Sequence, residues 1–137
     1  MNELDRLLIE RDCEQLSYSY ARYVDLGPAS RVPELFTSDA VCLLAAGEMR
    51  GRDEMVAFFG RMQERQSVSR HLITNISIHV LDDHSATGIA YLALYRRDAE
   101  DTESAITPVL VGHYDDVYEL TDEGWRFASR ITTPAFR

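Results

Sequence analysis

His71 and Asp25 are the residues whose types and positions could support catalysis near neutral pH. His71 lies near the start of an apolar, strand-like stretch, residues 69–80, and Asp25 lies at the end of a long helical pattern. A neutral imidazole is an effective general base near pH 7 when one ring nitrogen faces the substrate. A carboxylate on the other nitrogen fixes the tautomer and stabilises the imidazolium that forms. We predict that Asp25 and His71 form such a pair and abstract a proton from carbon in an apolar pocket.

Both residues also have plainer interpretations. Asp25 could be a solvated acid or a partner of Arg22, and His71 could be a core histidine that binds a backbone carbonyl. The position of Asp25 favours a functional role, because an acid in the last turn of a helix faces the negative end of the helix dipole. Arg70 alternates to the opposite face of the strand from His71 and is interpreted as a rim or structural residue.

Residues 3–25 are predicted to form the helix that positions Asp25. Its apolar residues recur at spacings of three and four, which produces a single apolar face. That face consists of Ile9, Cys13, Leu16, Tyr20, Tyr23 and Val24. Gly27 and Pro28 end the helix, because glycine accepts the left-handed conformation and proline cannot continue the hydrogen-bond ladder.

The remainder of the chain predicts two further helices and a run of strands. The short helix covers residues 30–36, with Ser30 as its N-cap, and the other covers residues 53–62. The predicted strands are residues 39–46, 70–80, 86–96, 106–120 and 125–132. Helices followed by hairpin-connected strands indicate an α+β fold in one domain, residues 1–137, with the helices on one face of a curved, mostly antiparallel sheet.

The composition argues against several classes of function. Acidic residues outnumber basic residues by 23 to 14, giving a net charge of −9, whereas nucleic acids and anionic membranes bind basic surfaces. The N-terminal residues lack a signal-peptide pattern, and no apolar run approaches the ~20 residues of a membrane span. Cys13 and Cys42 are interpreted as buried free thiols, which favours a reducing, cytoplasmic location.

The sequence contains no recognisable motif for a metal, a cofactor or a covalent nucleophile. Its four histidines, His71, His79, His84 and His113, do not have the spacing of metal-binding pairs. Neither a glycine-rich phosphate loop nor a nucleophile elbow is present. We therefore expect chemistry that needs neither metal nor cofactor.

Several short segments, in a characteristic order, carry a resemblance to a known family. They read LFTSDA at residues 35–40, RHLITN at 70–75, GHYDD at 112–116 and GWRFASR at 124–130. With the long first helix ending at Asp25, they resemble the SnoaL-like group of the nuclear transport factor 2-like superfamily. The resemblance implies a cystatin-like cone, in which a strongly bent sheet wraps the first helix around a deep apolar pocket. It also implies a small hydrophobic, cyclic or aromatic ligand.

Within this superfamily the chain is most similar in motif to scytalone dehydratase and hexachlorocyclohexane dehydrochlorinase. Both use an aspartate and a histidine at the positions of Asp25 and His71. The dehydrochlorinase has a lysine where this chain has Tyr20, while its pocket arginine is matched by Arg130. The dehydratase has a tyrosine at the position of Val24 and a second histidine near that of Arg96. The resemblance therefore implies the Asp–His pair without the additional groups of either enzyme.

Alternation along the long strand, residues 106–120, places further polar residues. Tyr114 and Asp116 share the face that the resemblance assigns to the pocket, and both are candidates for substrate contact. Asp116 could instead pair with Arg126 or Arg130. Tyr91, on the preceding strand, could offer its hydroxyl to the substrate or could simply be packed in the core.

Two classes of function follow from these observations. One is a lyase, dehydratase, isomerase or cyclase that uses Asp25 and His71, with Tyr20, Tyr91, Tyr114, Asp116 and Arg130 as substrate contacts. The other is a non-catalytic ligand-binding or assembly module, such as the small subunit of a ring-hydroxylating dioxygenase. A homodimer or homotrimer is expected in either case, because the outward face of the sheet carries Val109, Val111 and Val117.

Overall fold

The computed structural model describes residues 1–136 and begins with a long helix, α1 (Glu3–Leu26). Asn2 caps it by accepting a hydrogen bond from the Asp5 backbone N–H at 2.8 Å, while the Asp5 side chain accepts from the Asn2 N–H at 3.1 Å. Gly27 ends it with a φ of 87° and donates its N–H to Tyr23. The predicted helix is confirmed, and Asp25 lies in its last turn.

The second helix differs in type from the one predicted. It is a 3₁₀-helix, η1 (Ala29–Leu35), and Pro33 lies inside it. Proline lacks the N–H that an α-helical ladder needs, which favours a short 3₁₀ segment. The prediction of Ser30 as an N-cap is wrong, because Pro28 holds that position without a side-chain cap. The Ser30 backbone N–H donates instead to the Gln63 side chain at 3.0 Å.

Six strands and one more helix complete the chain. Between the first two strands and the rest lies α2 (Gly51–Gln63), at the position of the third predicted helix. The strands are β1 (Phe36–Leu44), β2 (Gly47–Arg50), β3 (Ser67–Val80), β4 (Ser85–Asp98), β5 (Pro108–Thr121) and β6 (Gly124–Pro134). They form one sheet in the order β2-β1-β6-β5-β4-β3. The β1–β6 pair is parallel and the other pairs are antiparallel.

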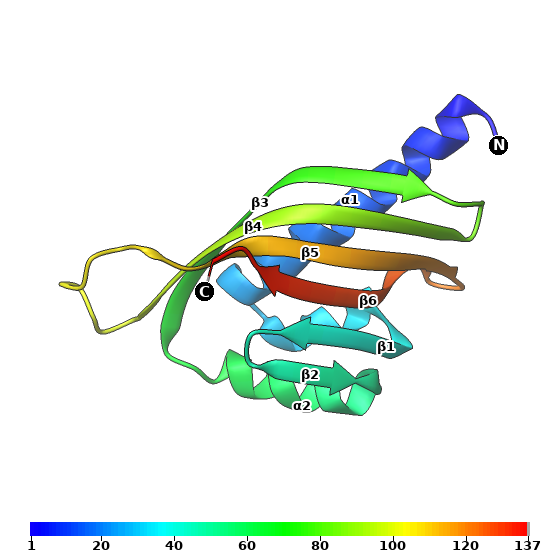
Figure 1. Ribbon diagram of the computed structural model, residues 1–137. Coiled ribbons are helices and arrows are strands. Elements are labelled where there is room, and N and C mark those ends of the chain that lie inside the picture. The colour runs from blue at the N-terminus through cyan, green and yellow to red at the C-terminus, as the bar shows by residue number, and fades with distance from the viewer. Residues whose placement is uncertain (137) are drawn as a thin grey trace.

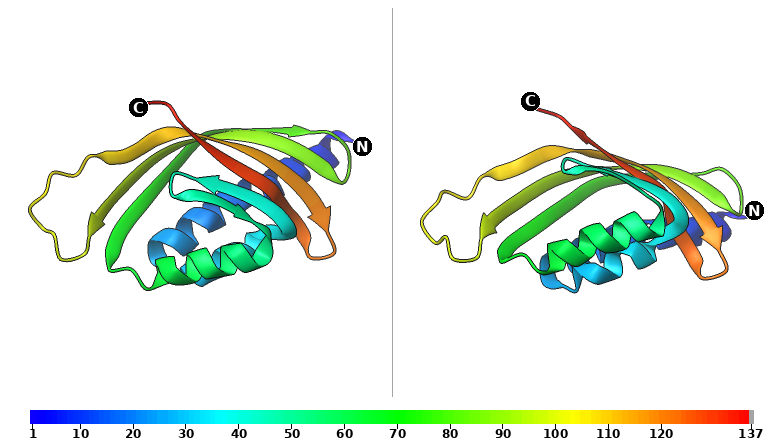
Figure 2. Two further views of the ribbon diagram at one scale, coloured as in Figure 1. Left: turned by 60° about the horizontal axis from the view of Figure 1, so that its bottom comes forward. Right: turned by 90° about the horizontal axis from the view of Figure 1, so that it is seen from below.

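The sheet is strongly bent, and the helices lie on its concave side. Figure 1 shows α1 crossing behind β3 to β6, with its first turns extending beyond the sheet. In Figure 2 the strands arch over α1 and α2. The predicted α+β cone is therefore confirmed. Within residues 1–136, no helix has both the length and the apolar character needed to cross a membrane.

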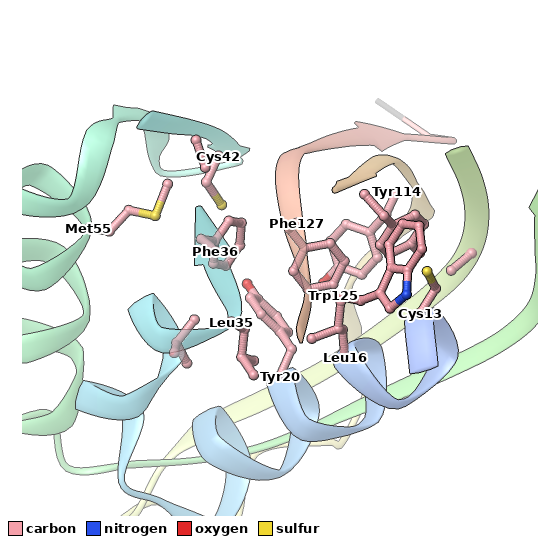
Figure 3. Packing of buried hydrophobic residues seen from close by; sticks show 14 of the residues in the cluster. Cys13, Leu16, Tyr20, Leu35, Phe36, Cys42, Met55, Tyr114, Trp125 and Phe127 are labelled. Atoms are coloured by element: carbon pink, nitrogen blue, oxygen red, sulfur yellow. The ribbon is translucent and has the colours of Figure 1, made fainter. Parts of the chain in front are cut away.

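The hydrophobic core fills the space between α1 and the inner face of the sheet. In Figure 3, Tyr20 points from α1 toward the strands that carry Phe36 and Phe127. Cys13 and Cys42 lie in this core as free thiols, which confirms the interpretation of both cysteines. Burial raises the pKa of each thiol to about 12, so neither is a thiolate nucleophile at neutral pH.

Candidate functional site

The last turn of α1 and the start of β3 bring Asp25 and His71 into direct contact. The Nδ1 atom of His71 lies 2.7 Å from Oδ1 of Asp25, and the two side chains are only 5% and 7% exposed. The other carboxylate oxygen accepts the backbone N–H of His71, also at 2.7 Å. Ser69 donates its hydroxyl to Oδ1 at 2.8 Å. These three hydrogen bonds hold the carboxylate against the imidazole.

The protonation of the pair follows from these contacts. Burial raises the pKa of Asp25, but hydrogen bonds from the ring and backbone of His71 and from Ser69 outweigh it, so that the pKa lies below its ordinary value. Asp25 is therefore ionised at neutral pH and can only accept hydrogen bonds. The proton between the side chains consequently resides on Nδ1 of His71. In the neutral ring, Nε2 then carries a free lone pair.

The free nitrogen of His71 is open to a cavity. Within residues 1–136, the fully buried side-chain nitrogen and oxygen atoms that lack a hydrogen bond are Arg130 Nη1 and Thr132 Oγ1. Nε2 of His71 also forms no hydrogen bond within residues 1–136, but unlike those two atoms it is not fully buried. His71 lines the cavity, so Nε2 is accessible from that space.

The cavity is mostly apolar. Its volume is about 80 Å³. Its apolar lining comes from Val24, Leu44, Ala45, Ala46, Phe58, Met62, Leu92, Leu94 and Leu110. An adjoining hollow of about 140 Å³ shares Val24 and Met62 with it. Since a dry cavity that takes benzene measures ~150 Å³, a ring would have to occupy both hollows or displace Met62.

Tyr20 and Tyr114 supply phenol groups to the same cavity. The ring of Tyr20 meets His71 edge-on, with centroids 5.9 Å apart, and meets Tyr114 at 6.0 Å. Burial raises the pKa of both phenols well above the ordinary value, so both are protonated at neutral pH. They can donate hydrogen bonds but cannot act as bases. Both predicted residues therefore line the cavity with His71, and Tyr20 also packs against its ring.

Arg130 and Asp116 lie behind these tyrosines rather than on the cavity wall. Arg130 Nε is 2.9 Å from Asp116 Oδ1, and neither side chain is exposed. Arg130 also donates to Ser17 at 2.6 Å, and its guanidinium lies 3.7 Å from the ring centroid of Tyr114. Of the two alternatives for Asp116, pairing with Arg130 is the one observed. Neither residue lines the cavity, and Arg130 packs against the rings of Tyr20 and Tyr114. Their contact with substrate stays a prediction.

Tyr91 lies on the opposite side of the sheet from the cavity. It is 54% exposed and pairs with His113 across β4 and β5, whereas Ala90 pairs with Tyr114. Strand alternation therefore turns Tyr91 outward when Tyr114 faces inward. The alternative that Tyr91 is a core residue is therefore wrong, and Tyr91 does not line the cavity that contains His71.

Arg65 and Arg96 border the cavity, although sequence reasoning did not select them for it. Arg65 follows α2, and its backbone N–H donates to Met62 at 3.1 Å. Arg96 has the same strand parity as Leu92 and Leu94, both of which are buried. This continuation of an inward-facing alternation is the signal that could have identified Arg96.

One group of potential metal ligands occurs among residues 1–136, at the β3–β4 hairpin. Asp82, Asp83 and His84 hold their ligand atoms within 4.8 Å of one another and are all exposed. Hydrogen bonds of the turn account for Asp82, which accepts from the His84 N–H at 2.8 Å and the Ser85 hydroxyl at 2.9 Å. The group is not part of the cavity lining.

The sequence profile of the SnoaL-like domain matches residues 5–131, which is nearly the whole chain. The chain belongs to the SnoaL-like domain family. No curated protein matches this SnoaL-like domain in sequence. Many solved structures share its fold, and three illustrate their range.

The first is a protein from Novosphingobium aromaticivorans that is provisionally named a scytalone dehydratase. It is 20% identical, with a TM-score of 0.83, over 96% of this SnoaL-like domain and 87% of its own chain. A type 2 hexachlorocyclohexane dehydrochlorinase is 18% identical, with a TM-score of 0.82, over 98% and 90%. The third, provisionally named the beta subunit of an aromatic-ring-hydroxylating dioxygenase from N. aromaticivorans, is 15% identical, with a TM-score of 0.81, over 96% and 93%. At these identities the likeness concerns the fold alone.

Proposed function

We propose that this SnoaL-like domain is a cofactor-independent lyase or isomerase in which Asp25 and His71 act as a general-base pair on a small, largely apolar molecule. The observation that carries this proposal is the 2.7 Å contact between the Asp25 carboxylate and Nδ1 of His71 beside an apolar cavity. A core histidine would need only a backbone carbonyl. An ionised carboxylate buried against imidazole, with Nε2 left free, is the arrangement that a base requires.

In the proposed reaction, Nε2 of His71 removes a proton from a carbon atom next to a carbonyl group. The electron pair of the broken C–H bond moves toward the carbonyl oxygen and forms an enolate. The ionised Asp25 stabilises the imidazolium that results. The enolate then either expels a leaving group from the β-carbon, with its bonding electrons, or, when a C=C bond is conjugated with it, takes the proton back at the γ-carbon. The first outcome is an elimination or dehydration, and the second is an isomerisation. In a dehydration the imidazolium returns its proton to the departing hydroxide, which leaves as water.

Two features of the cavity support this role. Its mostly apolar lining lowers the local polarity, which would strengthen the interaction of Asp25 with the imidazolium. The protonated phenols of Tyr20 and Tyr114 line the same space, and a phenol O–H that donates to the substrate would stabilise negative charge on its oxygen. No lysine or second histidine is required for proton abstraction itself.

Deuterium exchange tests the proposal without a known substrate. The protein is incubated in D₂O with a panel of small cyclic ketones and β-hydroxy ketones, and loss of the α-proton signal is followed by ¹H NMR. We expect wild-type protein to accelerate exchange or elimination for at least one compound, and His71→Gln to abolish it. The matched control is His113→Gln, because His113 pairs with Asp115 at 3.2 Å on the outer face. Exchange that persists at the full rate in His71→Gln would refute the proposal.

The alternative is a non-catalytic assembly or ligand-binding module. The specific observation in its favour is the apolar outer face of the sheet, where Leu72, Tyr91 and Val109 are 50%, 54% and 56% exposed. This role has no use for a buried, ionised Asp25 against His71. An Asp25→Asn variant with unchanged assembly and no measurable loss of any activity would favour the alternative.

The same outer face supports a proposed homo-oligomer, whether the domain is an enzyme or not. Exposed apolar side chains on β3, β4 and β5 form a surface that a second copy would cover. Light scattering coupled to size-exclusion chromatography is expected to give a dimer or trimer for the wild type. Tyr91→Lys should shift the population toward monomer, whereas a monomeric wild type would contradict the proposal.

A further inference from the structure

Two arginines lie where the inner cavity meets the adjoining hollow. Four residues line both spaces: Val24, Met62, Arg65 and Arg96. The first two are apolar and the other two carry guanidinium groups, so the junction combines hydrophobic and cationic side chains. A third, more open hollow is also lined by Arg65 and Arg96. Any molecule that enters the cavity by this route passes both cations.

The register of β3 and β4 fixes Arg96 close to the general-base pair. Arg96 stands directly opposite Ser69, and Leu94 stands directly opposite His71. Arg96 and His71 are therefore diagonal neighbours on the inner face, a relationship that spans roughly 7–8 Å and lies within reach of an arginine side chain. Ser69, which donates its hydroxyl to Asp25, lies between them in this arrangement.

The charges of Arg65 and Arg96 are not neutralised within the described chain. Ion pairs closer than 4.0 Å occur at Arg31, Arg50 and Arg130 in residues 1–136, but not at Arg65 or Arg96. Most arginines in residues 1–136 lack an ion pair, so Arg65 and Arg96 are distinguished by their place at the cavity junction. Asp98, Glu100 and Asp101 line the more open hollow together with both arginines. Asp25 accepts the hydroxyl of Ser69, which lines the adjoining hollow.

We propose that Arg65 and Arg96 bind a carboxylate group of the substrate while its apolar part reaches toward His71. This inference rests on the proposed function of the cavity and specifies its substrate class: a small apolar acid. Guanidinium groups bind carboxylates through paired, charge-assisted hydrogen bonds. A monoanion also suits the local charge, because Asp25 already contributes one negative charge beside the two cations. A phosphate dianion would meet stronger repulsion from Asp25 and from the outer acids.

Binding of benzoate and its neutral isostere benzamide tests the proposal. Dissociation constants are measured by ¹H–¹⁵N NMR titration at low ionic strength for the wild type, Arg65→Gln, Arg96→Gln and the double variant. We expect the wild type to prefer benzoate by about tenfold, each single variant to reduce that preference, and the double variant to abolish it. Arg97→Gln is the matched control, because Arg97 lies on the same strand but pairs with Val68 on the outer face.

Several results would overturn the carboxylate site. They are an absence of benzoate binding, equal affinity for benzoate and benzamide, a preference that survives in the double variant, and tighter binding of phenyl phosphate than of benzoate. The His71→Gln variant separates this proposal from the general-base proposal. It should keep the benzoate preference while losing deuterium exchange. Wild-type protein that prefers benzoate but catalyses no exchange would refute only the general base, and the converse would refute only the carboxylate site.

Discussion

One carboxylate, that of Asp25, binds both the backbone N–H and the ring of His71, at 2.7 Å in each case. The backbone bond fixes where the carboxylate sits relative to β3, and the ring bond fixes the orientation of the imidazole. Neither depends on the rest of the cavity lining. The geometry of the pair is therefore built into the junction of α1 and β3.

Replacement of Asp25 by Asn should impair proton abstraction while preserving the fold. An amide cannot stabilise the imidazolium as a carboxylate does, and its NH₂ group competes for the tautomer of His71. We expect a loss of about 10²- to 10⁴-fold in the exchange rate, measured by NMR in D₂O. Asp115→Asn, which disrupts the exposed pair with His113, should leave the rate unchanged. A similar loss in both variants would show that the effect is not specific to the cavity.

The contribution of Asp25 to stability should depend on pH in a defined direction. Its pKa is lower in the folded protein than the ordinary value of 3.8. A lowered pKa stabilises the folded state above the unfolded-state value, and this contribution disappears as the pH falls through the folded-state value. The difference in free energy of unfolding between wild type and Asp25→Asn should therefore be constant near neutral pH and shrink below about pH 4. Urea unfolding between pH 3 and 7 measures it, and a difference that grows on acidification would contradict the assignment.

Ser69 should affect stability more than catalysis. Its hydroxyl donates to Asp25 at 2.8 Å and is buried, but the carboxylate keeps both hydrogen bonds to His71 when it is removed. Ser69→Ala is expected to cost about 1–2 kcal/mol of unfolding free energy and less than about tenfold in rate. Ser77→Ala, on the exposed outer face of β3, serves as the control in urea unfolding. A large rate loss without destabilisation would instead assign Ser69 a direct catalytic role.

Removing one member of the Arg130–Asp116 ion pair should destabilise the fold, whereas replacing both members with apolar residues should not. Both side chains are fully buried, so Arg130→Met leaves the charge of Asp116 in the core without a cation and with only the hydrogen bond from the Tyr118 hydroxyl. The expected loss is about 3–5 kcal/mol in urea unfolding, and Arg130→Met combined with Asp116→Leu should recover most of it. Arg126→Met, at a partly exposed position on the same strand, is the control. If the double variant is as unstable as the single one, the ion pair does more than balance charge.

The elements that carry Asp25 and His71 could be predicted from the sequence for physical reasons. Gly27 and Pro28 define the end of α1, and the apolar alternation around His71 defines β3. An acid at an unfavourable helix end and a histidine at a strand entrance are local signals. Their meeting is a tertiary event, and the resemblance to SnoaL-like proteins supplied it.

The errors arose where side-chain size misleads about the direction of a strand residue. On β4 the small residues Ala86 and Ala90 face inward, because α1 and the bent sheet leave little room, while Ile89 and Tyr91 face outward. The pairing register of β4 decides which of its residues face inward, and this register cannot be read from a single sequence. Arg96 was passed over for the same reason, since a charged residue near the end of a strand resembles a surface residue until its neighbours are placed.

The contact between Asp25 and His71 also joins the end of α1 to β3, two elements far apart in the chain. The Nδ1 proton of His71 is shielded from solvent only while that end of the helix is docked. Its NMR resonance, well downfield of the amide region, therefore reports the closed state of the helix–sheet junction at a single atom. Broadening or loss of this resonance below the global melting temperature would reveal local opening. The same hydrogen bond therefore provides an internal probe of how often the junction between α1 and β3 opens.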